Sequence, residues 1–213
     1  MKNNDAFYLF CRFMLFLFFS VFFRFRTTGG GKIPRTGGGI IASNHLSYLD
    51  PIILSIGSPR ILSFMAKREL FEGNGFFSWL IRALNAFPIE RDKADLKAIR
   101  VAIDKLKNQS ATMIIFPEGT RSLTGEIGPA QSGMGMLAAK SGAWVVPALI
   151  IGTNAALPSH SKKLKFFEKI EVHFGDPVYF SQVYPESGTK ENYQSFSDLV
   201  VEGIKKIKIS LSR

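Results

Sequence analysis

Residues 39–51 read GIIASNHLSYLDP, an apolar run that passes directly into a polar loop. Residues 39–43 have the length and composition of a buried strand, and Pro51 opens a short helical pattern that extends to Gly57. A loop that joins a strand to a helix lies at the carboxyl end of that strand, where open α/β sheets bind their ligands. This loop is therefore the first candidate functional site in the chain.

His45 and Asp50 are the side chains of this loop with the chemistry of a general base and its partner. Histidine exchanges protons near neutral pH, and a carboxylate that accepts its Nδ1–H fixes the tautomer and stabilises the imidazolium. A spacing of five residues places the two on different faces of a regular helix, so they can meet only across a turn, which Pro51 favours. Two simpler roles remain: Asp50 as the N-cap of helix 51–57, and His45 as a hydrogen-bonded residue at a strand end.

The rest of the chain alternates between strand-like and helix-like segments. Apolar runs predict strands at 39–43, 61–66, 86–90, 112–116, 144–151 and 170–174, and helical patterns lie at 51–57, 76–84, 93–108, 134–140 and 193–211. This alternation predicts an α/β fold with a largely parallel central sheet flanked by helices. Residues 27–39 are rich in glycine and predict a loop or linker, so we expect an N-terminal segment over 1–37 and a domain over 38–213.

The N-terminal segment is the most apolar part of the chain. Only Arg12 and Ser20 interrupt the apolar run over residues 6–23, which as a helix would be about 27 Å long, close to the thickness of the hydrocarbon core of a bilayer. Because Arg12 opposes insertion, a spanning helix and a helix lying in the membrane interface are both consistent with the sequence. In either case we expect residues 1–37 to be a membrane-anchor helix followed by the glycine-rich linker. A cleaved signal peptide fits poorly, and a buried core helix is a further alternative.

Charge and composition narrow the choice of partner. Lys and Arg number 27 against 17 Asp and Glu, a net charge of +10, which suits an anionic partner. Nine of the 20 Phe lie in the first 26 residues in one apolar segment, which favours lipid over nucleic acid. The basic residues that follow this segment predict that the bulk of the chain lies on the cytoplasmic side: Arg24, Arg26, Lys32 and Arg35. The single Cys and three widely spaced His exclude a disulfide framework and give no metal-ligand spacing.

Two further strand ends carry residues suited to bind phosphate. Residues 116–122 read FPEGTRS, in which Arg121 offers a planar fork of donors, while Thr120, Ser122 and backbone N–H groups add neutral ones. Glu118 would then pair with an Arg or hold an acceptor hydroxyl, although the whole loop is also compatible with a polar surface turn. Arg91 directly follows the strand predicted at 86–90. It is a candidate for a second phosphate ligand, or it forms a surface salt bridge.

These segments together resemble the glycerolipid acyltransferase family, specifically the lysophosphatidic acid acyltransferases. Four ordered blocks carry the resemblance, and they are Asn44-His45 with Asp50, Ile89-Glu90-Arg91, residues 116–122, and Val145-Val146-Pro147-Ala148. The sequence departs from the family pattern at Asn85, where Gly is common, and at Gln131, where Lys is common.

The resemblance implies an acyl transfer in phospholipid biosynthesis, from acyl-CoA or acyl carrier protein to the free hydroxyl of lysophosphatidic acid, giving phosphatidic acid. It implies that His45 is the base, that Asp50 orients it, and that the glycerol phosphate is held by Arg91, Glu118, Gly119, Thr120 and Arg121. Asn44, Ser122 and Pro147 would support the site. The resemblance implies no metal and no tightly bound cofactor, and as partners an anionic membrane and the two substrates, with no nucleic acid.

Three alternatives remain at this stage. The absence of Lys at position 131 keeps other acceptors open, namely glycerol 3-phosphate, another lysophospholipid or a lipid alcohol. A hydrolase could use Ser47 or Ser122 with His45 and Asp50, although the sequence has no Gly-x-Ser-x-Gly elbow around either serine. A basic, membrane-anchored protein that binds anionic lipid or nucleic acid without catalysis is the third.

Overall fold

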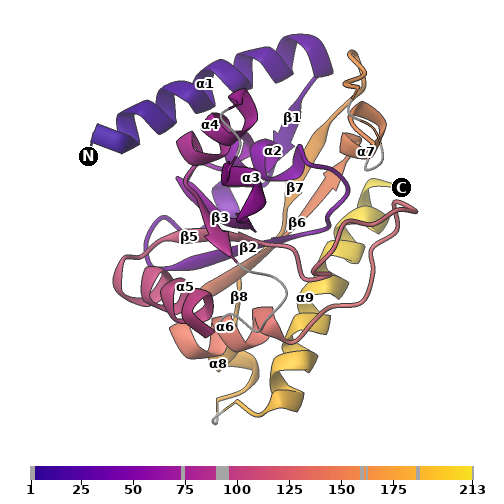
Figure 1. Cartoon of the computed structure of the whole chain (residues 1–213). Helices are drawn as coiled ribbons and strands as arrows, with labels where there is room; N and C mark the ends of the chain where they lie inside the picture. Colours follow the sequence, from indigo (N-terminus) through magenta and orange to yellow (C-terminus); the bar gives the residue numbers. More distant parts are fainter. Residues whose placement is uncertain are drawn as a thin grey trace.

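Figure 1 shows the computed structural model of the chain, which describes residues 3–72, 75–89, 96–158, 161, 163–185 and 188–212. The strands are β1 (Arg26–Thr28), β2 (Gly39–Ser43), β3 (Leu62–Lys67), β4 (Ala86–Ile89), β5 (Thr112–Ile115), β6 (Trp144–Ile151), β7 (Glu171–Phe174) and β8 (Val178–Tyr179). The helices are α1 (Asn3–Phe23), α2 (Asp50–Gly57), α3 (Glu69–Glu72), α4 (Phe76–Ala83), α5 (Leu96–Asn108), α6 (Gly133–Ser141), α7 (Thr153–Ala156), α8 (Phe180–Val183) and α9 (Lys190–Leu211), with a 3₁₀ turn η1 at Gly30–Lys32.

The strands of these described ranges form one sheet in the order β1-β7-β6-β2-β5-β3-β4, with β8 paired to β6. The central strands β6, β2, β5, β3 and β4 run parallel, whereas β7 and β8 are antiparallel to β6. This confirms the predicted α/β fold with a largely parallel sheet. Because β2 lies between β5 and β6, the loops that leave these three strands meet at the carboxyl edge of the sheet.

Helices cover both faces of the sheet. On one face, Ile41, Ile114 and Val146 pack in a core with residues of α1, α2 and α4. On the other face, their sequence neighbours Ile40, Met113 and Val145 pack with residues of α5, α6 and α9 (Figure 1). A strand that is buried on both faces is apolar at nearly every position, which explains why almost continuous apolar runs located these strands.

The sequence prediction missed the shortest elements, which are β1, β8, α3, α7 and α8. The loop expected over residues 27–39 is wrong at Thr27 and Thr28, which pair with Val172 and His173 as part of β1. Helix α9 begins at Lys190 rather than 193, because Thr189 caps it by accepting a hydrogen bond from the backbone N–H of Asn192. The predicted start of the helix at 93–108 lies outside the described residues, which show this helix from Leu96.

Helix α1 packs on the domain by one face. Tyr8, Cys11, Phe19 and Phe23 are buried at helical spacing, and the Tyr8 hydroxyl accepts a hydrogen bond from the backbone N–H of Leu62 at 3.1 Å. Arg12 lies on the same side and donates to the Ser58 carbonyl at 3.0 Å, at the C-terminal end of α2. Some aromatic side chains of α1 therefore belong to the domain core, whereas the others lie on the exposed face of the helix.

His173 of β7 is a buried histidine distant from the candidate loop. It is 8% exposed, its Nδ1 lies 2.8 Å from the Thr28 hydroxyl, and its Nε2 has no hydrogen-bond partner among the residues that the structure describes. Burial lowers the pKa of His173. The charge of Glu171 raises this pKa by a smaller amount, and the charge of Lys169 lowers it further. The folded protein therefore favours the neutral imidazole.

We expect this histidine to make stability depend on pH below about 6.5, the ordinary pKa of an unfolded histidine. The unfolded chain then binds a proton that the folded chain does not, so the free energy of unfolding falls as the pH is lowered. The test is urea unfolding at pH 7.5 and at pH 5.5. Between these two pH values, the free energy of unfolding should fall less for His173→Asn, whose side chain can still bond Thr28, than for the wild type. Equal losses in both proteins would contradict the assignment.

Candidate active site

The turn after β2 brings His45 and Asp50 together. His45 Nδ1 lies 2.8 Å from Asp50 Oδ2, and the Asp50 side chain is fully buried. The same Oδ2 accepts hydrogen bonds from the backbone N–H groups of Leu46 at 2.5 Å and Ser47 at 2.7 Å. Asp50 is the first residue of α2 and Leu49 occupies the N-cap position, so the alternative role of Asp50 as N-cap is wrong.

The second carboxylate oxygen of Asp50 accepts a hydrogen bond from the segment that follows β6. Thr153 Oγ1, at the start of α7 after β6, donates to Asp50 Oδ1 at 2.6 Å, and Thr153 is fully buried. All four recorded contacts are donors to the carboxylate, so together they orient it and compensate for the burial of its charge. Sequence reasoning missed Thr153, because nothing local to it points to a partner 103 residues away.

The His45 ring is fixed on a second side by Phe116. The two rings stack with centroids 3.9 Å apart and planes 11° from parallel. Phe116 is part of the quoted block 116–122, but the sequence suggested no role for its ring. With Nδ1 on Asp50 and the plane set by Phe116, Nε2 is the nitrogen of His45 left to accept a proton from a bound hydroxyl.

The main chain of His45 is tied to the loop that follows β5. Glu118 Oε1 accepts a hydrogen bond from the His45 N–H at 3.1 Å, and the Ser122 N–H donates to the His45 carbonyl at 2.7 Å. The other Glu118 oxygen accepts from the Gly128 N–H at 3.1 Å. Glu118 thus joins His45 to its own loop, and the described residues show no ion pair between Glu118 and an Arg.

Thr120 and Ser122 of this loop line a cavity of about 400 Å³ together with Glu118 and Gln131, whereas Gly119 and Arg121 are not part of its lining. Gly119 has φ 73°, a left-handed conformation that glycine adopts without strain, and a Cβ there would displace the flexible end of the Gln131 side chain. The Arg121 guanidinium lies over the Tyr48 ring at 3.8 Å from its centroid. The structure therefore brings Arg121 next to the loop that carries His45.

The supporting residues have mainly structural contacts. Asn44 continues the pairing of β2 with β6, since its side-chain amide donates to the Ile150 carbonyl at 3.0 Å and accepts from the Ile150 N–H at 2.8 Å. Pro147 lies in β6 between the residues that pair with β8 and those that pair with β7. Its lack of an N–H therefore removes no hydrogen bond to either of these strands. Its ring lies beside Gly175 and Gly203, on the α9 side of the sheet.

Neither candidate serine is arranged as a nucleophile. The Ser47 hydroxyl is buried and donates to the Leu157 carbonyl at 2.7 Å. The Ser122 hydroxyl accepts from the Gly125 N–H at 3.1 Å. Among the described residues neither hydroxyl bonds the His45 imidazole, so the nucleophile–base contact that a serine hydrolase requires is not formed.

The two departures from the family pattern fall at different places. Asn85 has φ 58° in the turn before β4, at the amino edge of the sheet, where asparagine is among the residues that tolerate the conformation Gly adopts readily. Gln131 instead lies at the candidate site, where its side chain donates to the Glu118 carbonyl at 3.2 Å. Arg91, the second predicted phosphate ligand, lies outside the described residues.

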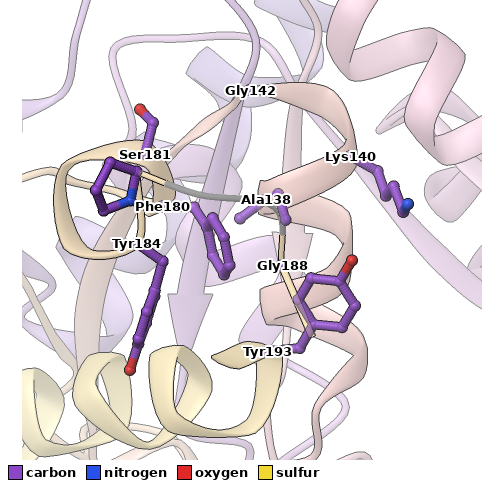
Figure 2. A pocket seen from close by; sticks show the side chains of 10 residues that line it. Ala138, Lys140, Gly142, Phe180, Ser181, Tyr184, Gly188 and Tyr193 are labelled. Atoms are coloured by element: carbon purple, nitrogen blue, oxygen red, sulfur yellow. The ribbon is translucent and has the colours of Figure 1, made fainter. Parts of the chain in front are cut away.

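A separate cavity of about 300 Å³ lies between α6, α8 and α9 (Figure 2). Phe180, Tyr184 and Tyr193 line it, with Lys140 at its side. Gly142, also in its lining, precedes the start of β6, so this cavity lies at the amino edge of the sheet, and none of the predicted site residues lines it.

Fold and site together define an α/β protein with a His–Asp pair and a neighbouring Arg-bearing loop at the carboxyl edge of its sheet. The acyltransferase family model matches residues 24–151. The chain therefore belongs to the acyltransferase family, which confirms the resemblance inferred from the motifs.

Individual relatives agree with this placement. The 1-acyl-sn-glycerol-3-phosphate acyltransferase of Bacillus subtilis is 30% identical over 183 residues, which cover 85% of this chain and 87% of the relative. The protein of the same name from Streptococcus pneumoniae is 30% identical over 154 residues, but this chain spans only 54% of its length. The crystal structure of the 1-acyl-sn-glycerophosphate acyltransferase PlsC from Thermotoga maritima superposes with a TM-score of 0.72 at 27% identity, over 98% of this chain and 84% of that one.

Proposed function

We propose that this protein transfers an acyl group from an acyl thioester, acyl-CoA or acyl carrier protein, to the free hydroxyl of lysophosphatidic acid, forming phosphatidic acid. The observation that carries the proposal is the His45 imidazole, held by Asp50 at Nδ1 with Nε2 left for a substrate hydroxyl. The names of the Bacillus subtilis and Streptococcus pneumoniae relatives support lysophosphatidic acid as the acceptor.

The reaction follows from this geometry. His45 Nε2 takes the proton of the acceptor hydroxyl while the oxygen attacks the thioester carbonyl, and the C–S bond breaks as the new ester forms. The proton then passes from the imidazolium to the departing thiolate. Asp50 stabilises the imidazolium between these steps. Because a thioester is already activated, deprotonation and positioning are the main tasks of the protein.

The acceptor phosphate is assigned to the loop after β5. Arg121 supplies a planar set of donors for phosphate oxygens, and its place beside Tyr48 puts it next to the His45 loop. Gly119, Thr120 and Ser122 belong to the same turn, and Arg91 completes the predicted set outside the described residues. Glu118 contributes by holding this loop to His45.

An assay with both substrates tests the proposed function. Labelled acyl-CoA, and separately acyl carrier protein, is offered with lysophosphatidic acid, glycerol 3-phosphate, a second lysophospholipid and a lipid alcohol in detergent micelles. We expect labelled phosphatidic acid. Product from another acceptor alone would overturn the acceptor assignment, free fatty acid without transfer would favour a hydrolase, and no product from any pair would overturn the proposed activity.

We also propose that α1 lies in the membrane interface rather than across the bilayer, with the domain on the cytoplasmic side. Among the described residues, α1 contains the one stretch long and apolar enough to span a membrane. A spanning α1 would have to leave the domain, because Tyr8 and Arg12 are hydrogen-bonded to it. Its outer face exposes a row of large apolar side chains: Phe7, Phe10, Phe13, Met14, Phe16, Leu17, Val21 and Phe22.

Aromatic side chains from other elements extend this outer face at both ends of α1. Trp79 of α4 is 48% exposed and its ring lies 5.9 Å from that of Phe7, and the ring of Phe76, which is 73% exposed, lies 5.6 Å from that of Trp79. Phe166 is 47% exposed and its ring lies 5.7 Å from that of Phe22, and the adjacent Phe167 is 65% exposed. Helix α1 runs along the outside of the molecule (Figure 1). The ring contacts at its two ends join these residues into one apolar surface, and the basic residues that follow α1 suit anionic headgroups.

Removing the aromatics at both ends of α1 should weaken vesicle binding without unfolding the protein. We expect the fourfold variant Phe76→Ser, Trp79→Ser, Phe166→Ser and Phe167→Ser to bind anionic phospholipid vesicles about 10²- to 10³-fold more weakly, since insertion of each of these partly exposed aromatics contributes roughly 0.7–1 kcal/mol, about 3–4 kcal/mol in all. Co-sedimentation measures the partition. Leu199→Ser with Ile209→Ser, also exposed but on α9, is the matched control. Unchanged binding of the fourfold variant would contradict the interfacial surface.

A further inference from the structure

The short helix α7 is fastened to the loop of His45 at both of its ends. At its start, Thr153 Oγ1 donates to Asp50 Oδ1 at 2.6 Å, and just beyond its end the Leu157 carbonyl accepts from the Ser47 hydroxyl at 2.7 Å. Thr153, Ser47 and Asp50 are all fully buried. The link therefore connects the carboxyl end of β6 to the His–Asp pair through groups that water does not reach.

The turn before α7 fixes the position of Thr153. Gly152 has φ 89°, and a Cβ there would lie 1.9 Å from the Lys169 carbonyl oxygen, so the chain can pass only with glycine. The chain thus leaves β6 with the Thr153 side chain directed to Asp50, which the hydrogen bond between them records.

Thr153 differs in role from the other donors to Asp50. Leu46, Ser47 and His45 all bond Oδ2, whereas Thr153 supplies the hydrogen bond recorded for Oδ1 in the described part of the chain. A carboxylate held at one oxygen alone can rotate about its Cβ–Cγ bond, and a second oxygen without a donor is unfavourable in a buried site. The hydroxyl of Thr153 therefore sets the carboxylate plane that His45 Nδ1 faces.

We infer that Thr153 is a positioning residue for the His45–Asp50 pair and acts on catalysis through its hydroxyl alone. The inference rests on the proposed acyl transfer for its kinetic consequence. Among the described residues the Thr153 hydroxyl bonds Asp50 and makes no hydrogen bond to His45, so its effect on His45 passes through Asp50. We therefore expect it to influence the rate of the chemical step and not the binding of either substrate.

Three variants test this inference. Thr153→Val keeps the shape and removes the donor, and we expect kcat to fall about 10- to 100-fold with KM for both substrates nearly unchanged, the effect of losing one hydrogen bond to a charged group. Thr153→Ser restores the donor and should recover most of kcat. Thr112→Val is the matched control, because Thr112 is also buried, at 1% exposed, and its Oγ1 has no hydrogen-bond partner in the described residues.

A readout without turnover separates this inference from the proposed function. The proton that His45 Nδ1 shares with Asp50 should give a far-downfield proton NMR signal in the wild type, Thr153→Ser and Thr112→Val, and a shifted or lost signal in Thr153→Val. A wild type with this signal and no acyl transfer would refute the function, while the NMR comparison still tests Thr153. An unchanged signal and kcat in Thr153→Val, or a loss that Thr153→Ser does not rescue, would overturn the inference.

Discussion

His45→Ala should lower kcat for acyl transfer by about 10²- to 10⁴-fold, the range that a general base contributes. Because Nδ1 of His45 is hydrogen-bonded to Asp50, Nε2 is the nitrogen that can accept the proton of the substrate hydroxyl. The fold should survive, because the His45 side chain lies at the edge of the core, 12% exposed, and its replacement removes one stacking partner of Phe116. Steady-state kinetics and thermal unfolding of the same preparation measure both effects.

His45→Asn separates the loss of the base from the loss of the hydrogen bond. An asparagine amide can reach the place of Nδ1 and donate to Asp50, but it offers nothing at the place of Nε2. Both variants should therefore be equally inactive, and both should still bind anionic vesicles as the wild type does. Acyl transfer that persists in His45→Asn would remove His45 as the base. Full transfer in His45→Ala would favour a non-catalytic role for the loop.

The sequence was sufficient for the parts of the molecule that depend on local pattern. Strands buried on both faces are mostly apolar, and the five main helices after α1 show amphipathic or apolar periodicity, so the sequence predicts each of these elements to within a few residues. Elements such as β1 and β8 have two or three residues and exist only because a neighbouring strand pairs with them. No period can be read from so short a segment.

The candidate site shows the same division. The turn at Pro51 predicts that His45 and Asp50 can meet, and the structure brings them together at 2.8 Å. Thr153 and the ring of Phe116 reach the pair from segments that follow β6 and β5 and are distant in sequence, so no spacing rule indicates them. The hydrogen bonds that Glu118 accepts from two backbone N–H groups could not be predicted either, because almost every residue type has a backbone N–H.

Asp50→Asn is expected to lower kcat by about 10³- to 10⁴-fold while the protein remains folded, by the scale known for a neutral amide in place of the triad aspartate in serine proteases. The asparagine carbonyl oxygen can replace Oδ2 and accept from Leu46 and Ser47, and the amide can donate to the Thr153 hydroxyl. What disappears is the negative charge that stabilises the imidazolium. Kinetics beside urea unfolding measure the two consequences, and a kcat within tenfold of the wild type would contradict this role for the carboxylate.

Asp50→Ala supplies the contrast, because it removes the acceptor of four donors, three of which belong to the buried residues Leu46, Ser47 and Thr153. Each donor left unsatisfied costs about 1–3 kcal/mol, so this variant should lose several kcal/mol of stability as well as activity, whereas Asp50→Asn should lose little stability. The double variant His45→Ala with Asp50→Asn completes the test. If Asp50 acts only through His45, the double variant is no slower than His45→Ala, since residues that act as a unit are not additive. A further loss in the double variant would mean that the Asp50 charge acts on the substrate directly, which its burial beneath His45, Leu46 and Ser47 argues against.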